Sequence, residues 1–428
     1  MEDAIKLARP EDVKSWPSLG LHLLVKNGES VVGRLVDCVG PYLDEVVAVL
    51  NDCEDDTRGE LARACGRHDV DLKICEVTRE SHPDLYVLDV PATYEVGHPL
   101  VGERFEVEHI GRPILAEWAT ARNVGWAMAT TDWLLHLDAD DVVADPECLP
   151  GLCQLMAERD LDVVATRYHY DHAADGTPRA DGMRERVARR SPEIYWRGAM
   201  HECLCGYRPG RVAHVEGNLV VHDRRDSTGA DVRISGRNLK ILYYHARRRD
   251  WQITPREMIY LAAEARATMP KLAAHLIEMY LEVSRWDEEK AWAASMRGEI
   301  YEDENNFELA AGWYQRSLDY FPSVMAAQRL ARACFRLQKW SACVAAYERS
   351  LACKSHVQAL DGGEVYEDAT KILVAVALLN LGRQAEASDL AIYLRQKYPD
   401  SPAVTLTIML ILKPEELSRF VTKSKRNP

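Results

Sequence analysis

The chain of 428 residues carries a formal net charge of −14 at pH 7, with 47% hydrophobic and 28% charged residues. This length predicts two or three domains. The composition is that of a soluble globular protein, and the acidic balance argues against sequence-independent binding to nucleic acid. No apolar run approaches the ~20 residues that span a bilayer, no secretory signal pattern is present, and the eleven cysteines have neither disulfide nor zinc spacing, so we expect a cytoplasmic protein with free thiols.

Three strands separated by short helices open the sequence. Residues 19–27 and 45–50 are apolar strands that each end in a polar turn before a helix, and 71–77 form a third strand. This order at short spacing predicts a parallel sheet with right-handed crossovers. Residues 78–113 are rich in Pro and Gly and predict a long loop over the sheet edge, and 114–129 predict a helix.

The next strand ends in acids. The apolar run of Trp133 to Leu137 is followed by Asp138, Asp140 and Asp141. The carboxyl end of a buried strand is the usual place for a site in an open α/β sheet. Asp138 and Asp140 reach one point where the strand breaks into a turn, and two hard oxygen ligands suit Mg²⁺ or Mn²⁺. Spacing alone serves equally well for solvated acids that cap the next helix.

The rest of the first half continues the sheet, and the second half is helical. Residues 162–170 and 212–222 predict further strands, with a helix at 146–159 between the acids and the first of them. From about residue 255 only helices are expected.

This helical half contains an internal repeat. Tyr314-Gln315-Arg316-Ser317-Leu318 recurs 33 residues later as Tyr347-Glu348-Arg349-Ser350-Leu351. The offsets of the repeat are set by small, aromatic and proline positions: Gly298, Tyr301, Ala310, Tyr314, Ser317 and Pro322. A later set of residues keeps the same frame: Ala375, Leu378, Ala387, Ala391 and Pro399. The period is that of the tetratricopeptide repeat, near ~34 residues, and predicts about four helix pairs stacked as a solenoid over 255–412. Its aromatic residues are expected in the core rather than at a binding surface.

Five short sequence motifs, which we call landmarks, follow one another along the first half of the chain. They are Val25-Lys26-Asn27 with Glu29, Asp55-Asp56-Thr57, Ala121-Arg122-Asn123, Asp138-Ala139-Asp140-Asp141, and Trp196-Arg197-Gly198-Ala199-Met200-His201-Glu202. On these landmarks, residues 1–230 resemble the family-2 glycosyltransferases, which have a GT-A fold. The last landmark is similar to an element of members that carry C-terminal tetratricopeptide repeats, a subgroup that includes bacterial enzymes that glycosylate proteins and peptides.

The resemblance implies a site for a nucleotide-diphosphate sugar, with a UDP-sugar as the first expectation. Its cofactor-binding residues are Asn27, Glu29, Asp52, Asp55, Arg122 and Asp138. The family places an Asp at the end of the second strand to hold uracil. An ungapped match puts Leu50 there, and Asp52 would take the role after a small shift.

The chemistry of the reaction gives the remaining residues their roles. The leaving diphosphate develops charge that a divalent metal (Mn²⁺ or Mg²⁺) held by Asp140 neutralises, and Asp138 contacts either this metal or the ribose. Arg122 contacts phosphate or forms a structural salt bridge to Asp138. His222, at a strand end, is a candidate third metal ligand or a packed histidine.

Inversion at the sugar carbon also needs a general base. Glu202 is the first candidate, with Asp141 and Glu117 as rivals. His201 would orient Glu202 or contact phosphate, and the alternative for this His-Glu pair is an ordinary surface dipeptide.

The sequence therefore predicts a metal-dependent inverting glycosyltransferase. Residues 1–250 would form an α/β catalytic domain with a mixed, mainly parallel, Rossmann-like sheet, and 255–428 a tetratricopeptide-like domain that binds a polypeptide acceptor or dimerises. One alternative is a transferase that acts on a small molecule, lipid, polysaccharide or modified nucleic-acid base. Another is a non-catalytic scaffold in which a decayed transferase domain presents the repeats.

Overall fold

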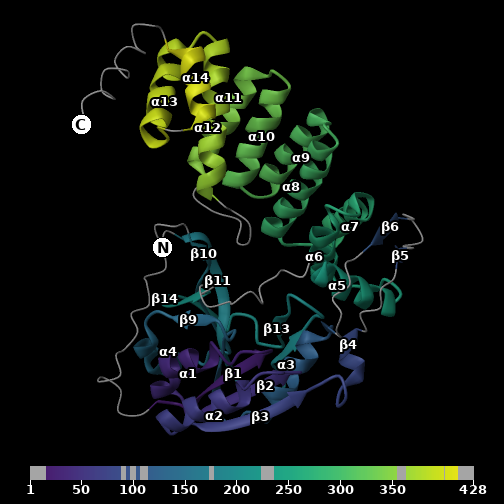
Figure 1. The fold of residues 1–428 in the computed structure, drawn as a ribbon, viewed down its shortest axis with the longest axis vertical. Coiled ribbons are helices and arrows are strands. Elements are labelled where there is room, and N and C mark those ends of the chain that lie inside the picture. The colour runs from purple at the N-terminus through teal and green to yellow at the C-terminus, as the bar shows by residue number, and fades with distance from the viewer. Residues whose placement is uncertain are drawn as a thin grey trace. The chain divides into compact units, whose positions relative to one another are not determined.

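A computed structural model gives the fold of the chain (Figure 1). The structure describes residues 16–87, 93–96, 103–106, 114–172, 178–222, 236–353, 363–399 and 401–412. The chain divides into two compact units, 1–264 and 265–428. The sequence places the boundary between 250 and 255, but the helix that follows residue 254 makes its polar contacts within the first unit.

The first unit is built on an eight-stranded mixed sheet with the order β3-β2-β1-β8-β11-β10-β14-β9. Its strands are β1 (Leu19–Val25), β2 (Glu45–Asn51), β3 (Asp71–Val77), β8 (Trp133–His136), β9 (Asp141–Val143), β10 (Val163–His172), β11 (Pro178–Arg189) and β14 (Val212–His222). β3, β2, β1 and β8 run parallel, while β11 is antiparallel to both of its neighbours. The α/β fold class predicted from the sequence is confirmed.

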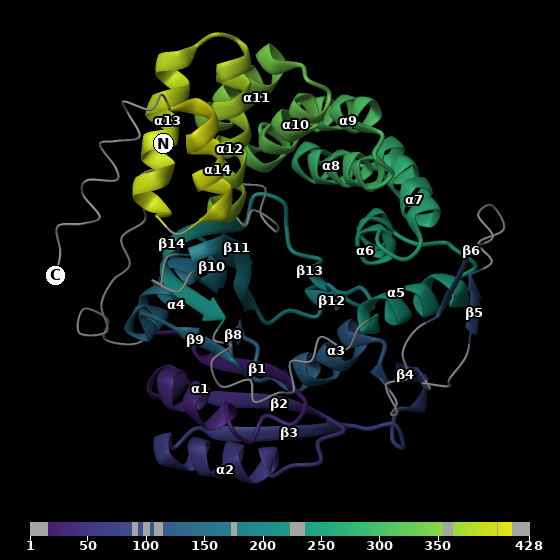
Figure 2. The same ribbon diagram turned by 45° about the horizontal axis from the view of Figure 1, so that its top comes forward.

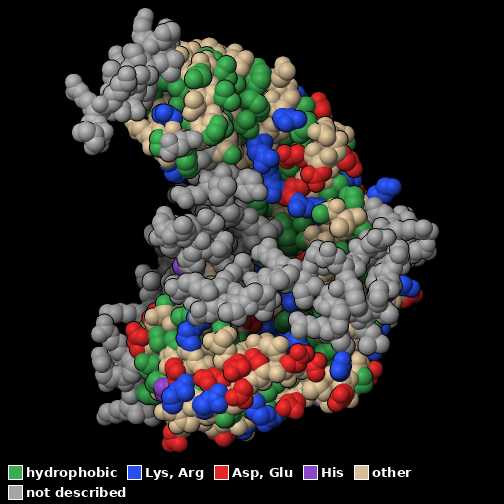
Figure 3. All heavy atoms as spheres, in the orientation of Figure 1, with side chains coloured by type: hydrophobic (Ala, Val, Ile, Leu, Met, Phe, Trp, Pro, Cys, Tyr) green, Lys and Arg blue, Asp and Glu red, His purple; other side chains and the backbone are tan. Residues whose placement is uncertain are grey.

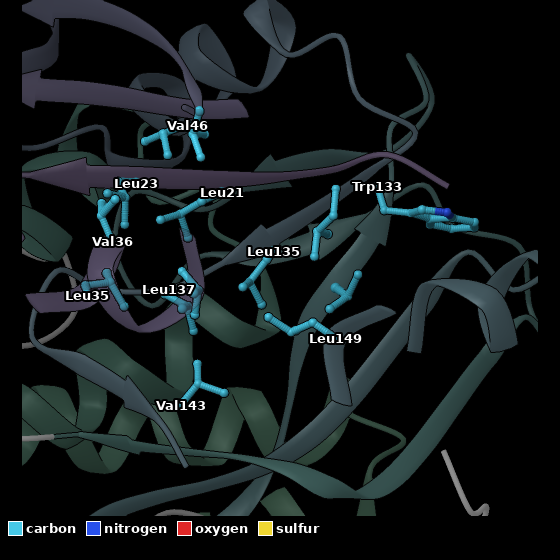
Figure 4. Packing of buried hydrophobic residues seen from close by; sticks show 14 of the residues in the cluster. Leu21, Leu23, Leu35, Val36, Val46, Trp133, Leu135, Leu137, Val143 and Leu149 are labelled. Carbon is cyan, nitrogen blue, oxygen red and sulfur yellow. The ribbon is translucent and has the colours of Figure 1, made fainter. Parts of the chain in front are cut away.

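Apolar side chains cover both faces of the parallel part of the sheet. Leu21 and Leu23 of β1 pack against Leu35 and Val36 of α1 (Val32–Val39) (Figure 4). The same core includes residues of α2 (Thr57–His68) and α4 (Leu149–Glu158). On the opposite face, β1 and β2 pack on α3 (Trp118–Met128). Burial on both faces is why these strands read as continuous apolar runs.

The outer surface around α2 and β3 is charged. Figure 3 shows acidic and basic side chains mixed on this part of the first unit. Ion pairs there join Arg58 to Glu76 at 2.7 Å and Arg67 to Asp37 at 2.8 Å. Exposed pairs of this kind contribute little to stability, so this surface is a solvated face.

Short elements connect the sheet to its helices. They are the 3₁₀ turns Gly40–Tyr42, Pro83–Leu85 and Pro146–Cys148, and the strands β4 (Tyr86–Val87), β5 (Thr93–Val96), β6 (Glu103–Glu106), β7 (Ile114–Leu115), β12 (Tyr195–Arg197) and β13 (Cys203–Cys205). The segment expected as one long loop thus contains two antiparallel strand pairs, β4–β7 and β5–β6. The pair β12–β13 frames the loop that carries His201 and Glu202. Helices α5 (Arg237–Arg248) and α6 (Pro255–Ala265) complete the unit.

The second unit is a series of antiparallel helix pairs (Figure 2). Its helices are α7 (Pro270–Val283), α8 (Asp287–Asp303), α9 (Phe307–Tyr320), α10 (Val324–Arg336), α11 (Trp340–Ala352), α12 (Gly363–Asn380), α13 (Gln384–Lys397) and α14 (Pro402–Ile411). Each packs on the next in chain order. The predicted repeat of helix pairs is confirmed.

The repeat residues pack as their spacing predicts. Gly298 of α8 lies against the ring of Tyr314 of α9, and a Cβ atom at position 298 would lie 2.5 Å from Tyr314 Cε1. Tyr314 is fully buried, and its hydroxyl donates to Glu302 Oε2 at 2.6 Å. Trp292 and Tyr347 are buried as well. These aromatic residues therefore belong to the core.

Candidate active site

The acids at the end of β8 form a tight turn. The backbone N–H of Asp141 donates to the carbonyl of Asp138 at 3.0 Å, and the Asp138 N–H donates to Asp141 Oδ2 at 2.9 Å. Asp141 is fully buried and its Oδ1 accepts from the Tyr168 hydroxyl at 2.8 Å. Burial, and then the Asp141 charge, raise the pKa of Tyr168 far above its usual value, so Tyr168 remains a donor. Asp141 thus shapes the turn, while the Asp138 side chain is 43% exposed.

Arg122 connects this turn to the second candidate acid. Its Nη2 donates to Asp138 Oδ1 at 3.2 Å, and its Nε donates to Glu202 Oε1 at 2.5 Å. The Arg122 side chain is only 4% exposed. Burial lowers the pKa of Arg122, and the two carboxylates more than compensate by raising it, so the guanidinium stays charged. Residues from α3, β8 and the β12–β13 loop therefore meet at one cation.

Aromatic rings hold Arg122 in this position. The guanidinium lies 5.3 Å from the Trp196 ring centroid, and Nη1 lies 3.5 Å from His136 Nδ1. His136 pairs in register with His22 on the neighbouring strand, and His22 Nε2 donates to the Arg122 carbonyl at 3.0 Å. Burial, and then the Arg122 charge, lower the pKa of His22 to about 3 and that of His136 well below its usual range. Both histidines are therefore neutral at pH 7 and do not repel Arg122.

The loop that carries Glu202 is fastened to α3. Asn123 exchanges two hydrogen bonds of 2.8 Å with the backbone of Trp196. The N–H groups of Trp118 and Ala119, in the first turn of α3, donate to the carbonyls of Ala199 at 3.0 Å and Gly198 at 3.3 Å. Gly198 has φ +111°, a conformation that side chains disfavour. This backbone conformation explains why the landmark has a glycine at position 198.

His201 lies beside Glu202 but faces α6. Its φ is +52°, in the left-handed region, and its ring stacks on Tyr260 with 4.1 Å between centroids. Burial, followed by the charges of Arg256, Arg184 and Arg237, lowers the pKa of His201 to about 4, so the ring is neutral at pH 7. Its part in catalysis stays a prediction.

The predicted nucleotide residues lie in two loops at the carboxyl ends of β1 and β2, which hydrogen-bond to each other. Asn27 Oδ1 accepts from the Glu54 N–H at 2.8 Å, and Asp55 Oδ2 accepts from the Glu29 N–H at 3.0 Å. Glu29 Oε2 accepts from the Asp56 N–H at 3.1 Å. Burial raises the pKa of Asp55, but hydrogen bonds from Thr57 and Glu29 lower it further, so the carboxyl stays ionised. These polar side chains order the loops, and nucleotide contact remains a prediction.

The position that departs from the family pattern is part of the core. Leu50 is 3% exposed, and Asn51 is buried with its side-chain oxygen accepting from the Tyr86 hydroxyl at 2.8 Å. Asp52 has a left-handed φ of +48° and a 28% exposed side chain. Of these three residues, Asp52 is thus the one whose side chain is partly exposed, whereas Leu50 and Asn51 are buried.

The metal hypothesis depends on Asp138, Asp140 and His222. The β14–β9 register places the His222 backbone opposite Asp141, next to the acid turn, but the His222 side chain lies outside the described residues. Among the side chains that the structure does describe, no three His, Cys, Asp or Glu groups gather as a metal site. Two carboxylates are nevertheless the usual protein share of a Mg²⁺ or Mn²⁺ site that is completed by substrate phosphates and water. The donor set therefore fits a substrate-linked cation.

Sequence reasoning missed the residues that support the site. His22 and His136 are the polar residues within otherwise apolar strands, and a buried polar group must find a partner. Their position within these strands could have indicated that they contact another polar group of the site. Glu117, the rival base, accepts a hydrogen bond from His245 Nδ1 at 3.0 Å, and its part in catalysis stays a prediction.

Comparison with known proteins agrees with this geometry. Residues 93–217 match the family model described as glycosyl transferase family 2. The first unit contains a family 2 glycosyltransferase domain. The matched segment includes Arg122, Asp138, Asp140, Asp141, His201 and Glu202, and ends before His222. No curated protein matches the chain.

Solved structures with some likeness to the chain are helical repeat proteins. MamA AMB-1 is 21% identical, covers 36% of this chain and 80% of its own, and has a TM-score of 0.29. A putative kinesin light chain of Podosopora anserina with TPR-like repeats is 14% identical, with coverages of 37% and 84% and a TM-score of 0.30. PilF of Pseudomonas aeruginosa is 10% identical, with coverages of 38% and 69% and a TM-score of 0.32. We base the repeat architecture on the chain's own helices.

None of the helices that the structure describes combines the length and apolar character needed to cross a bilayer.

Proposed function

We propose that the protein transfers a sugar, with inversion, from a nucleotide-diphosphate sugar to an acceptor, and that the reaction depends on Mn²⁺ or Mg²⁺. The observation that carries this proposal is the double contact of Arg122 with Asp138 and Glu202. A transferase of this kind needs a group that neutralises the charge of the leaving diphosphate and a base that accepts the proton of the acceptor. The buried guanidinium of Arg122 contacts a candidate for each role, Asp138 for the first and Glu202 for the second.

Asp138 and Asp140 are the residues that would hold the cation. A bound divalent cation supplies Lewis-acid neutralisation of the diphosphate as the bond to the sugar breaks. The chain itself contributes a fixed turn, because Asp141 is locked by Tyr168 and the Asp138 N–H. Arg122 holds Asp138 from the other side. This support keeps the turn and the Asp138 carboxylate in place before a donor arrives.

Glu202 is the base that we favour. In a single displacement, the acceptor atom bonds to the anomeric carbon, the bond to the diphosphate oxygen breaks, and the acceptor proton passes to the Glu202 carboxylate. Asp141 is a weaker candidate because it is fully buried with both oxygens engaged. Glu117 is paired with His245. Asp141 therefore acts as a positioning residue and Glu117 as part of the framework.

We further propose that the acceptor is a polypeptide, recognised through the second unit, with a UDP-sugar as the first donor to test. Stacked helix pairs form extended surfaces that suit extended partners.

The test is nucleotide release from a panel of nucleotide sugars with Mn²⁺, using the full chain. Asp140→Ala is expected to lower the rate at least ~100-fold because several kcal/mol of charge stabilisation are lost. Glu202→Gln is expected to lower it about 10²- to 10⁴-fold, the usual contribution of a general base. The control is Asp303→Asn, an exposed acid at the end of α8. Equal rates for Asp140→Ala and the wild type, or no turnover of any donor, would leave the scaffold alternative.

A further inference from the structure

The loop between β12 and β13 is held on two sides, and only one of them belongs to the site described above. From α3 come the amides of Trp118 and Ala119 and the side chains of Arg122 and Asn123. The other side is α6, whose residues lie outside the segment that matches the family model. No step of the proposed reaction uses them.

Arg256 and Tyr260 lie one turn apart on α6 and contact the loop at His201. Arg256 Nε donates to the His201 carbonyl at 2.8 Å. The Arg256 guanidinium lies 5.0 Å from the Tyr260 ring centroid, and the His201 ring stacks on the same tyrosine with an interplanar angle of 15°. The backbone and the side chain of His201 are thus both fixed by α6.

His201 needs this support because of its backbone. Its φ of +52° is in the left-handed region, which costs energy for a residue with a Cβ atom and persists only where the surroundings impose it. The peptide group of His201 leads directly into Glu202, so the orientation of its carbonyl sets the direction in which the Glu202 side chain leaves the backbone. A hydrogen bond from a charged donor is stronger than a neutral one, and Arg256 supplies it at that carbonyl.

Helix α6 is itself firmly anchored in the first unit. Thr254 and Glu257 form a capping box, with the Thr254 N–H donating to Glu257 Oε2 at 2.7 Å and the Glu257 N–H donating to Thr254 Oγ1 at 3.3 Å. Glu257 Oε1 lies 2.8 Å from His245 Nε2, and His245 Nδ1 lies 3.0 Å from Glu117 Oε1, at the start of α3. Arg256 is therefore attached to the helix that also positions Arg122.

We propose that Arg256 and Tyr260 are positioning residues for Glu202: they hold His201 in its left-handed conformation and thereby aim the carboxylate at the acceptor. The assignment rests on the proposed function. It implies that the catalytic part of the chain extends beyond the family 2 segment into α6.

The test compares variants by enzyme kinetics and by hydrogen exchange of the 198–205 amides. Arg256→Gln is expected to lower kcat about 10- to 100-fold, because a ~1 Å displacement of a reacting group has effects of this size. The KM for the donor should stay within about twofold, because Asp138 and Asp140 are untouched. Exchange of the loop amides should become at least ~10-fold faster as the loop opens locally.

Conservative variants and a matched control separate positioning from folding. Tyr260→Leu should act like Arg256→Gln, whereas Tyr260→Phe keeps the stack and should restore kcat to within about threefold of the wild type, since the ring face provides the contact. Arg247→Gln, an exposed arginine on α5 of the same unit, is the control.

An unchanged kcat or unchanged loop exchange in Arg256→Gln, with an active wild type, overturns the positioning role alone. Loss of donor affinity together with kcat, or a loss equal in Tyr260→Phe and Tyr260→Leu, also overturns it. If the wild type turns over no donor, the proposed function fails and the role of Glu202 fails with it.

Discussion

The two units bury different kinds of residue. Among the described side chains, the first unit buries many charged or titratable groups, including Arg122, Asp141, Arg186, His245 and Glu257. The corresponding core of the second unit holds alanines, larger aliphatic residues and tyrosines, and Lys371 is its one buried charged group within the described residues. Buried charges are costly unless they are paired. The repeats are therefore stabilised mainly by close apolar packing, whereas the first unit keeps buried ionised groups that are paired with one another.

The pairing around Arg122 gives the largest expected effect. Arg122→Met would leave Asp138 and Glu202 without their shared cation, and we expect a loss of about 3–5 kcal/mol in the free energy of unfolding. Nucleotide release should fall at least ~100-fold, because the base and the acid turn lose their common support. Urea unfolding and the donor assay measure the two effects.

The control for Arg122 is Arg58→Met, which removes an exposed ion pair with Glu76. It should leave both measurements nearly unchanged, since exposed pairs contribute little. Similar losses in the two variants would contradict the contrast between buried and exposed charge.

The second largest effect on stability is expected from His245 and the two glutamates that it contacts, and this effect depends on pH. Burial lowers the pKa of His245, but the hydrogen bonds that its ring donates to Glu117 and Glu257 outweigh burial and raise the pKa from 6.5 to about 9. Because the folded state favours the protonated form, the stabilisation is complete below pH 6.5 and is lost as pH rises through 9. This stabilisation of the folded state amounts to about 3 kcal/mol.

Urea unfolding at pH values from 6 to 10 checks this expectation. The wild type should lose stability across that window, and His245→Gln should show a flatter profile with its main deficit at low pH. Parallel profiles for the two proteins would contradict the assignment.

In the second unit, where the core is apolar and closely packed, we expect stability to depend on the volume of the buried side chains. Gly298→Ala would place a Cβ atom 2.5 Å from the Tyr314 ring, and overpacking of this kind costs about 1–3 kcal/mol. The matched control is Gly312→Ala on α9, where no atom lies within 4 Å of a new Cβ. Alanine should there stabilise the helix by up to ~1 kcal/mol. Thermal unfolding monitored by circular dichroism should shift in opposite directions for the two variants, and equal shifts would contradict the packing described.

The units also differ in what the sequence reveals. The period that joins Tyr314 to Tyr347 is local, and it sufficed to predict the helix pairs. The parallel arrangement of Leu19–Val25, Glu45–Asn51 and Asp71–Val77 was predictable as well, because short crossovers between successive strands allow few alternatives. The acid turn and the His201-Glu202 landmark could be named from the sequence as well.

Contacts between distant segments could not be predicted. His245 pairs with Glu117 across 128 positions, and Arg256 reaches His201 across 55. Neither residue belongs to a periodic pattern or a motif, and their partners depend on how α5 and α6 pack on the sheet domain. The short strands β4 to β7 were missed because segments of two to four residues carry too little alternation to be recognised.

The fastening of the Glu202 loop to α3 restricts where the chain tolerates changes in length. One face of the helix binds residues 196, 198, 199 and 202 through positions 118, 119, 122 and 123. Helical rise and rotation are fixed, so the five residues between Trp196 and Glu202 match about one turn of α3. A single inserted residue there would move Glu202 away from Arg122 while leaving both segments otherwise intact. Natural length variation should therefore avoid this loop.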